Sequence, residues 1–248
     1  MARDDLKAKY QKKRESAPPE AWGQEGERKV RLVQNHAVYA GMVEAMDLAV
    51  GKVLTYLSET GLDENTVVFF MSDNGGLSTS EGHPTSNLPL RAGKGWLYEG
   101  GIREPMIIKW PGITQPGSIC DVPVISTDFY PTILNIAGIT SKPDQHKDGI
   151  SLVPLLEGRK KLDREGLFWH YPHYGNQGGS PGSAIRMEDY KLIEFFEDHH
   201  VELYHLGNDI GEKQNIAESE PEKTRELLER LHEWQNEIGA KFPTPNPN

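Results

Sequence analysis

The pattern of apolar and polar positions predicts a helix followed by a buried strand. From about Val30 to Thr60, apolar residues recur at helical spacing, and Gly61 is a suitable stop. The apolar run Val67 to Met71 follows and ends abruptly in the polar, glycine-containing segment 72–76. A short run rich in Val and Phe is typical of a strand that is covered on both faces in a parallel sheet. Residues 1–29 are polar and predict a short helix followed by a loop.

Asp73 and Asn74 come directly after this predicted strand. In open α/β sheets, ligands bind beyond the carboxyl ends of the strands. A carboxylate and an amide oxygen suit Ca²⁺ or Mg²⁺, and Gly75 and Gly76 allow another part of the backbone to approach closely. The alternative for such a segment taken alone is an ordinary turn that closes a strand.

The second half of the chain changes from one pattern to another near residue 160. Before it, we expect a strand at 119–125, a helix at 129–137 capped by residues 126–128, and a helical turn at 151–156. After it, four short strands and a hairpin turn at Glu188-Asp189 predict an antiparallel sheet, at 167–171, 183–187, 190–197 and 201–206. An amphipathic helix follows at 221–239.

These elements predict an α/β protein in two parts. Residues 1–160 would form part of a large, mainly parallel sheet that is flanked by helices, and residues 161–248 a small domain with an antiparallel sheet and a packed helix. The tail Lys241 to Asn248 contains three prolines and is expected to be extended or disordered.

A polar loop at 77–90 separates the predicted strand from a second one at 106–110. Long loops in compact domains often carry function, and His83 within this loop is a candidate substrate contact. The loop leads into Gly93-Lys94-Gly95, where a lysine between two glycines is sterically open. Lys94 could therefore hold an anion, and a loop lysine in solvent is the alternative.

His170 and His173 lie in the aromatic segment 168–174, which is followed by a polar, glycine-rich stretch at 175–179. This composition suits a loop that reaches from the small domain towards a ligand, and aromatic side chains pack well against sugars. An aromatic core segment with hydrogen-bonded histidines explains the same pattern equally well.

Composition excludes several classes of function. The 248 residues carry a formal net charge of -10, and no Lys/Arg stripe offers the clustered positive charge that nucleic acid requires. Cys120 is the single cysteine, so there is neither an intrachain disulfide nor a cysteine-based zinc cluster. No apolar run is long enough to span a membrane, and the charged segment Met1 to Arg14 shows no signal peptide.

Several motifs together resemble one family. They are SDNGG at 72–76, GKG at 93–95, YEGGIREP at 98–105, WPG at 110–112 and TDFYPTIL at 127–134. In this order they are similar to the type I sulfatases of the alkaline-phosphatase-like superfamily, and especially to bacterial members that act on carbohydrate or aryl sulfates. The likeness continues through 168–174, 184–192 and 202–209 and so covers nearly the whole chain.

The resemblance implies roles for three residues. Asp73 and Asn74 match two ligands of the family's metal, normally Ca²⁺, and Lys94 matches a lysine that contacts the sulfate. The family's nucleophile is a formylglycine made from Cys or Ser in the pattern Cys/Ser-x-Pro-x-Arg, and that pattern is absent, because the proline after Cys120 is one place late. The motifs that carry the resemblance include no counterpart of the family's early Asp-Asp pair or of its Lys-x-His group. The chain therefore resembles the carboxyl-terminal half of a periplasmic or secreted sulfatase.

We therefore expect a sulfatase fragment whose complete form hydrolyses sulfate esters, with a sulfated carbohydrate and the missing amino-terminal half as partners. Two oxygen ligands leave Ca²⁺ mostly hydrated, and no nucleophile is present, so the chain alone is expected to be inactive. The alternative is a non-catalytic module that binds metal or glycan or takes part in assembly.

Overall fold

The computed structural model describes residues 2–244, which form two compact units. The larger unit contains the chain up to Leu54, Ser72–Pro105 and the chain from Phe168 onward, and the smaller unit contains Thr55–Met71 and Met106–Leu167. The domain boundary near residue 160 stays a prediction. Of the predicted extended tail, residues 241–244 have no regular secondary structure, and residues 245–248 lie outside the described part of the chain.

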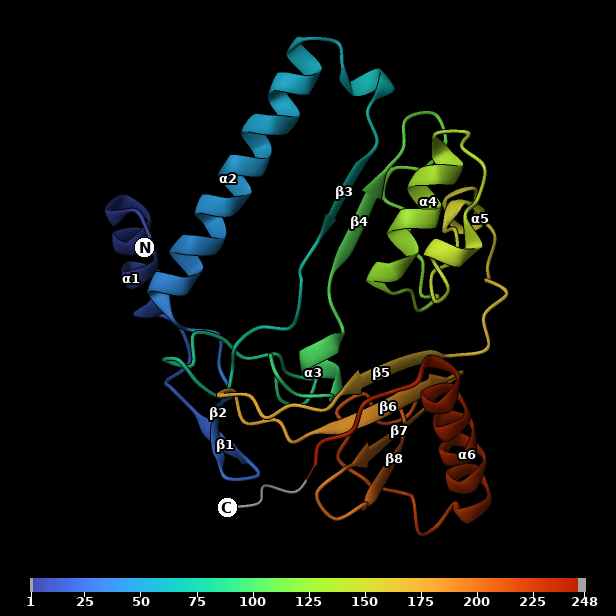
Figure 1. Ribbon diagram of the computed structural model, residues 1–248. Helices are drawn as coiled ribbons and strands as arrows, with labels where there is room; N and C mark the ends of the chain where they lie inside the picture. The colour runs from blue at the N-terminus through green and yellow to red at the C-terminus, as the bar shows by residue number, and fades with distance from the viewer. Residues whose placement is uncertain (1, 245–248) are drawn as a thin grey trace. The chain divides into compact units, whose positions relative to one another are not determined.

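A four-stranded sheet organises the larger unit (Figure 1). Its order is β5-β6-β7-β8, and the strands span Leu167–Tyr171, Gly182–Met187, Tyr190–Phe195 and Val201–His205. The pairs β6 with β7 and β7 with β8 are antiparallel, which confirms that part of the prediction. The predicted hairpin turn contains Glu188, which takes a positive φ of 52°.

One face of this sheet packs against the helix α6, Pro221–Ile238. The register aligns Ile185 with Leu192 and Leu192 with Leu203, so the three side chains share that face. They form a buried cluster with Leu227 and Leu231, both of which are at most 1% exposed. The predicted amphipathic helix is therefore confirmed, and Gly239 ends it in the left-handed conformation at φ 62°.

The opposite face of the sheet holds the segment that contains Lys94. Ala184, Ile193 and Tyr204 form a second buried cluster with Ala92, Leu97 and Tyr98. Because both ends of residues 92–98 are buried on the sheet, the loop between them has a defined position.

A buried lysine connects this sheet to the short helix α3, Glu99–Ile102. The Lys191 ammonium is fully buried on β7 and lies 3.1 Å from the Glu99 carboxylate and 2.8 Å from that of Glu212. Glu212 also accepts a 2.6 Å hydrogen bond from the Glu99 backbone N–H. Burial raises the pKa of Glu212, whereas the charge of Lys191 acts in the opposite direction. The charges of the three groups compensate one another in a site that is buried from solvent.

The amino-terminal segment contains a hairpin that was not predicted. After α1, Asp4–Arg14, the strands β1, Trp22–Glu25, and β2, Arg28–Arg31, pair antiparallel. The predicted helix at 30–60 therefore begins later, as α2, Ala37–Glu59. No helix of the described residues is long and apolar enough to cross a membrane.

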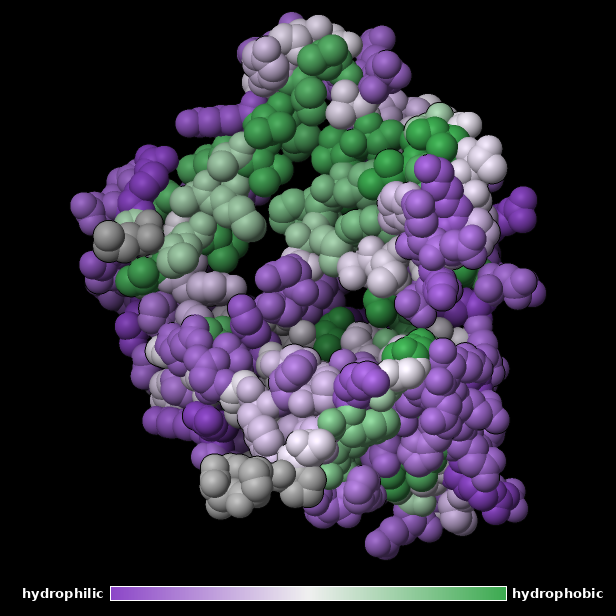
Figure 2. Space-filling model, in the orientation of Figure 1, coloured by the Kyte–Doolittle hydropathy of each residue, from purple (hydrophilic) through white to green (hydrophobic). Residues whose placement is uncertain are grey.

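Most of the apolar face of α2 is exposed (Figure 2). Only Ala37 and Gly41 of this helix are buried. Seven of its large apolar side chains are exposed by 41% to 62%, and they are Met42, Val43, Met46, Leu48, Val53, Leu54 and Tyr56. Contiguous apolar surface of this kind marks a face that packs against another structure.

The smaller unit contains β3, Val68–Met71, and β4, Met106–Lys109, which pair antiparallel. The expected mainly parallel sheet is not found among the described residues, because β3 pairs only with β4. All four residues of β3 are half-buried, not buried on both faces. An apolar run shows that a strand packs against something, but it does not identify the partner strand or its direction.

The helices of the smaller unit are short. They are the α-helices α4, Phe129–Ile136, and α5, Val153–Leu156, and the 3-10 helices η1, Asp63–Asn65, η2, Ser126–Asp128, and η3, Pro143–Gln145. The strand predicted at 119–125 is wrong, since this segment has no regular structure. Residues 126–128 were predicted to cap the helix at 129–137. Among them, Asp128 is fully buried and accepts hydrogen bonds from the backbone N–H groups of Ile125 and Ile150.

The exposed face of α2 predicts association of the isolated chain. We expect the purified chain to bind ANS and to self-associate as its concentration rises, because water contacts the apolar side chains directly. Replacing Met46 and Val53 by Glu should reduce both effects, whereas Lys52→Glu on the same helix should not. Light scattering and ANS fluorescence measure them. A monomeric chain without ANS binding would contradict this prediction.

The buried charge cluster predicts a large loss of stability on removal of its cation. Lys191→Met should lower the free energy of unfolding by about 3 to 5 kcal/mol, because the buried Glu212 would lose its ion-pair partner and Glu99 would keep only the more distant Arg103 and Arg186, at 3.8 and 3.7 Å. Lys160→Met, on an exposed side chain, is the matched control and should change stability by less than about 0.5 kcal/mol. Urea denaturation compares the two. Equal stability of both variants would refute the account.

Candidate functional site

The loop that carries Asp73 and Asn74 lies directly against the loop that carries Lys94. The Lys94 backbone N–H donates a 3.3 Å hydrogen bond to the Gly76 carbonyl. The Gly75 N–H donates to the Gly101 carbonyl at 3.0 Å, and the Gly100 N–H donates to the Arg91 carbonyl at 2.8 Å. Three segments that are separated in the sequence are thus joined through their backbones.

Glycine is required at these positions because the backbones are in direct contact. A Cβ atom on Gly75 would lie 1.7 Å from the Gly100 carbonyl oxygen, and one on Gly93 would lie 2.3 Å from the Gly76 oxygen. A Cβ on Gly101 would lie 2.1 Å from the Trp96 oxygen. Real Cβ atoms do not approach oxygen so closely, so any side chain here would separate the loops.

Asp73 and Asn74 present oxygen atoms at this junction. The Asp73 side chain is exposed. The Asn74 amide nitrogen donates to the Gly75 carbonyl at 3.1 Å, which leaves the Asn74 side-chain oxygen as the group that could bind a cation. The Ser72 hydroxyl donates to the Asn74 backbone carbonyl at 2.9 Å and so supports the turn.

Glu104 lies close enough to Asp73 for the two carboxyl groups to interact electrostatically. Burial, with a further contribution from the negative charge of Asp73, raises the pKa of Glu104 to about 7. The buried Oε1 of Glu104 has no hydrogen-bond partner among the described residues. Both observations fit a divalent cation near Asp73, although no group of three or more His, Cys, Asp or Glu side chains in residues 2–244 could hold a metal ion. The chain therefore offers part of a coordination sphere.

Lys94 is half-buried between two glycines, and nothing in residues 2–244 pairs with its ammonium group. Gly95 has a φ of 88°, a conformation that favours glycine. An unpaired ammonium group on a positioned loop is suited to an anion. Hydrogen bonds link the loop to its surroundings through the backbone and leave the charged end of the side chain available.

The polar segment 175–179 packs beside Gly95. The Gln177 carbonyl accepts hydrogen bonds from the Thr79 hydroxyl at 2.8 Å and from the Trp96 indole at 3.1 Å. The Asn176 amide donates to the Glu81 carboxylate at 2.7 Å. The structure thus brings this segment and the loop 77–90 together beside Gly95, and the expected reach of the segment towards a ligand stays a prediction.

The three candidate histidines have different surroundings. The His83 ring stacks edge-on against Trp22 at 5.3 Å between ring centroids, and the residue has a positive φ of 49°. Both ring nitrogens of His170 have partners within the chain, the Ser183 hydroxyl at 2.7 Å and the Lys241 carbonyl at 2.8 Å. His173 is exposed and lies near Tyr171. The contacts of His170 favour its structural alternative, and His83 and His173 stay candidates.

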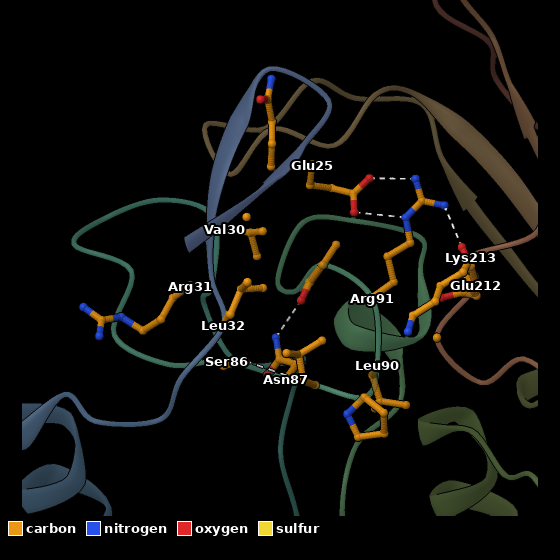
Figure 3. A pocket seen from close by; sticks show the side chains of 16 residues that line it. Glu25, Val30, Arg31, Leu32, Ser86, Asn87, Leu90, Arg91, Glu212 and Lys213 are labelled. Carbon is orange, nitrogen blue, oxygen red and sulfur yellow. Dashed lines mark hydrogen bonds and ion pairs between the residues drawn. The ribbon is translucent and has the colours of Figure 1, made fainter. Parts of the chain in front are cut away.

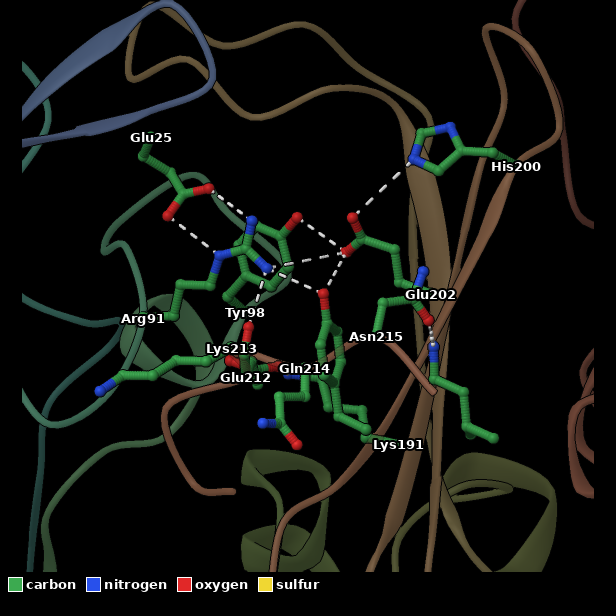
Figure 4. A network of polar contacts seen from close by, with 12 residues as sticks. Glu25, Arg91, Tyr98, Lys191, His200, Glu202, Glu212, Lys213, Gln214 and Asn215 are labelled. Atoms are coloured by element: carbon green, nitrogen blue, oxygen red, sulfur yellow. Dashed lines mark hydrogen bonds and ion pairs between the residues drawn. The ribbon is translucent and has the colours of Figure 1, made fainter. Parts of the chain in front are cut away.

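Arg91 anchors the segment that leads into the lysine loop (Figure 4). Its guanidinium group pairs with both oxygens of Glu25 at 2.7 and 3.0 Å and lies 3.7 Å from the centre of the Tyr98 ring. It also donates to the Tyr204 hydroxyl at 2.8 Å. Tyr98 and Tyr204 in turn donate to Glu202 at 2.8 and 2.9 Å, and burial raises the pKa of both tyrosines. This network joins the hairpin β1–β2 to the sheet, and it was not predicted from the sequence because its members lie in distant segments.

A cavity of about 340 Å³ lies beside Arg91 (Figure 3). The hairpin residues 23–25 and 30–32, the segment 86–92 and the turn 211–213 line it. Asp73, Asn74 and Lys94 do not line it. Its volume falls within the range of small-molecule sites, roughly 300 to 1,000 Å³, but it is separate from the candidate cation and anion groups.

Two family models match the chain. The model described as "Sulfatase" matches residues 2–139, and that described as "N-sulphoglucosamine sulphohydrolase, C-terminal" matches residues 92–240. A sulfatase of Formosa agariphila is 38% identical over 251 residues, which cover 94% of this chain and 42% of the relative. Arylsulfatase A of Homo sapiens is 33% identical and is matched over 77% of this chain and 41% of its own length.

Solved structures show the same fold. Ps i-CgsB, in complex with k-i-k-neocarrahexaose, superposes with a TM-score of 0.75 and 28% identity over 94% of this chain and 46% of that one. A protein in complex with its substrate D-glucosamine-2-N,6-O-disulfate superposes with a TM-score of 0.70 and 30% identity over 84% of this chain and 41% of that one. The chain spans less than half the length of these relatives. With family matches over both of its halves and the motifs around Asp73 and Lys94 brought together in space, the chain belongs to the sulfatase family.

Proposed function

We propose that this chain is the carboxyl-terminal part of an enzyme that hydrolyses sulfate esters of a carbohydrate. Asp73 and Asn74 bind a divalent cation, Ca²⁺ or alternatively Mg²⁺, and Lys94 contacts the sulfate group. The observation that supports this most strongly is the contact between the two loops, in which the Lys94 N–H donates to the Gly76 carbonyl. It holds a cation-binding pair and an unpaired ammonium group on adjoining backbone segments.

The chemistry divides between this chain and the rest of the enzyme. Sulfate ester cleavage needs a nucleophile, an acid for the leaving alcohol and positive charge at the sulfuryl oxygens. Asp73, Asn74 and Lys94 provide for the positive charge, and the bound cation would supply the larger part of it. The formylglycine nucleophile and the acid belong to the amino-terminal half, since the pattern Cys/Ser-x-Pro-x-Arg does not occur in this sequence.

A sulfated carbohydrate is the proposed substrate class. Two structural neighbours were solved with a neocarrahexaose and with a disulfated glucosamine, which supports a sugar ligand for this chain. In this chain, the polar segment 175–179 lies beside Gly95, and the exposed side chains of His173 and Tyr174 precede it. We assign this segment, with His83, to the sugar.

The alternative is a non-catalytic module that binds metal or glycan, which the missing nucleophile pattern supports. The two functions differ in what happens when the chain is joined to an amino-terminal sulfatase half that carries formylglycine. Turnover that depends on Lys94 identifies the enzyme, whereas binding without turnover identifies the module.

The isolated chain is expected to have no sulfatase activity. The sequence lacks the nucleophile pattern, and the described residues 2–244 lack most of the ligands that Ca²⁺ requires. Purified chain should release no sulfate from aryl or carbohydrate sulfates. Turnover by the wild-type chain that Lys94→Ala abolishes would show that the expectation is wrong.

Cation and sulfate binding should separate by residue. Asp73→Ala should weaken Ca²⁺ binding by about tenfold or more because a charged ligand is lost, and Asn74→Ala should weaken it less. Lys94→Ala should leave Ca²⁺ binding within about twofold and weaken binding of inorganic sulfate by about tenfold or more, because the side-chain cation assigned to the anion is lost. Asp121→Ala, on an exposed acid, is the control. Calorimetric titrations with each ion make the comparison, and equal behaviour of Asp73→Ala and Asp121→Ala would remove the metal assignment.

A further inference from the structure

The Asn87 side chain lies between the two loops of the candidate site. Its amide nitrogen donates a 2.7 Å hydrogen bond to the Gly76 carbonyl and a 2.8 Å hydrogen bond to the Ala92 carbonyl. Gly76 follows the proposed cation ligands by two residues, and Ala92 precedes Lys94 by two residues. Figure 3 shows the amide nitrogen directed at the backbone of the neighbouring loop. One side chain therefore contacts both loops.

The glycines on either side make room for this amide. A Cβ atom on Gly76 would lie 2.6 Å from the Asn87 side-chain oxygen, and one on Gly93 would lie 2.7 Å from its nitrogen. The Asn87 amide thus fits between two glycine Cα atoms, one from each loop. This packing is independent of the hydrogen bonds and points to the same function for the residue.

The hydrogen bonds also determine which way the amide faces. Both partners are carbonyl oxygens, so the nitrogen must face them, because the oxygen would repel them. The Gly76 carbonyl receives its shorter hydrogen bond from Asn87, at 2.7 Å, and its longer one from the Lys94 N–H, at 3.3 Å. Of the two groups that donate to the Gly76 carbonyl, the Asn87 amide is therefore the closer one.

The second hydrogen bond of the Asn87 amide is to Ala92, a residue with a strained backbone. Ala92 has a positive φ of 57°, which is unfavourable for a residue with a Cβ atom. Its carbonyl accepts hydrogen bonds from Asn87 and from the Ser78 hydroxyl, the latter at 2.9 Å. These donors maintain the turn that directs the chain into Gly93 and Lys94.

We propose that Asn87 is a positioning residue that clamps the loop of Asp73 and Asn74 to the loop of Lys94, so that the cation and the sulfate bind as one coupled site. The inference rests on the proposed function. It adds that the affinities of the two ions depend on each other through this amide. Two ligands that share one rigid site strengthen each other's binding by the same factor.

Asn87→Asp tests the clamp directly, because it keeps the size of the side chain and replaces the donor by an oxygen that repels both carbonyls. The readout is hydrogen exchange of the Lys94 amide, which donates to Gly76, and of the Gly75 amide. Both should exchange about tenfold faster or more, whereas the Leu192 and Ile193 amides in β7 should not change. Asn65→Asp, on an exposed residue, makes the same chemical change and should have no effect. Unchanged exchange at Lys94 in Asn87→Asp overturns the proposal.

The effect of sulfate on the affinity for Ca²⁺ gives a second readout, and a general loss of protein stability would not change it. In the wild-type chain, inorganic sulfate should tighten Ca²⁺ binding by about fivefold or more, within the usual range of coupling between sites. In Asn87→Ala, which removes the donors without adding charge, each ion alone should bind within about threefold of wild type, and the coupling should fall below about twofold. Coupling that persists in Asn87→Ala overturns the clamp.

The two hypotheses fail in different ways. If Asp73→Ala and Lys94→Ala leave the binding of both ions unchanged, the proposed function is wrong, and the exchange of the Lys94 and Gly75 amides still decides whether Asn87 clamps the loops. If both ions bind through Asp73 and Lys94 but Asn87→Ala changes neither coupling nor exchange, the proposed function stands and the clamp is refuted.

Discussion

The candidate site depends on direct contact between backbones at the glycines. Gly75, Gly93, Gly100 and Gly101 each face a carbonyl oxygen at a distance that no Cβ atom could occupy. The hydrogen bonds from Gly75 to Gly101 and from Gly100 to Arg91 form only because these segments meet without side chains between them. The position of the segment that carries Asp73 and Asn74 relative to the Lys94 loop depends on that contact.

Buried charge holds the same region from the side of the sheet. Lys191 joins β7 to Glu99, the first residue of α3, and Arg91 joins the lysine segment to Glu25 and Tyr204. Buried ion pairs add little net stability compared with apolar packing, but their geometry is specific, and breaking one is costly. The sheet β5–β8 thus acts as a support whose one face carries α6 and whose other face carries the site.

Two features of the described residues lack partners within the chain. The apolar face of α2 is exposed, and Glu104 beside Asp73 has a buried oxygen without a hydrogen-bond partner. The first is apolar surface in contact with water, and the second is a buried polar atom without a partner. The proposed place of this chain within a longer enzyme accounts for both, since the relatives are more than twice as long as the segment that matches it.

The sequence by itself determined the elements whose signal is local. Short strand-forming runs on either side of a turn at Glu188 located β6, β7 and β8, and helical periodicity located α6, because both signals lie within a few neighbouring residues. The types of residue at Asp73, Asn74 and Lys94 indicated a cation and an anion. Tertiary structure decided the rest: the antiparallel partner of β3, the hairpin β1–β2, the hydrogen-bonded state of His170, and the position of Asn87 between two loops. These depend on contacts between distant segments, which periodicity along the chain does not record.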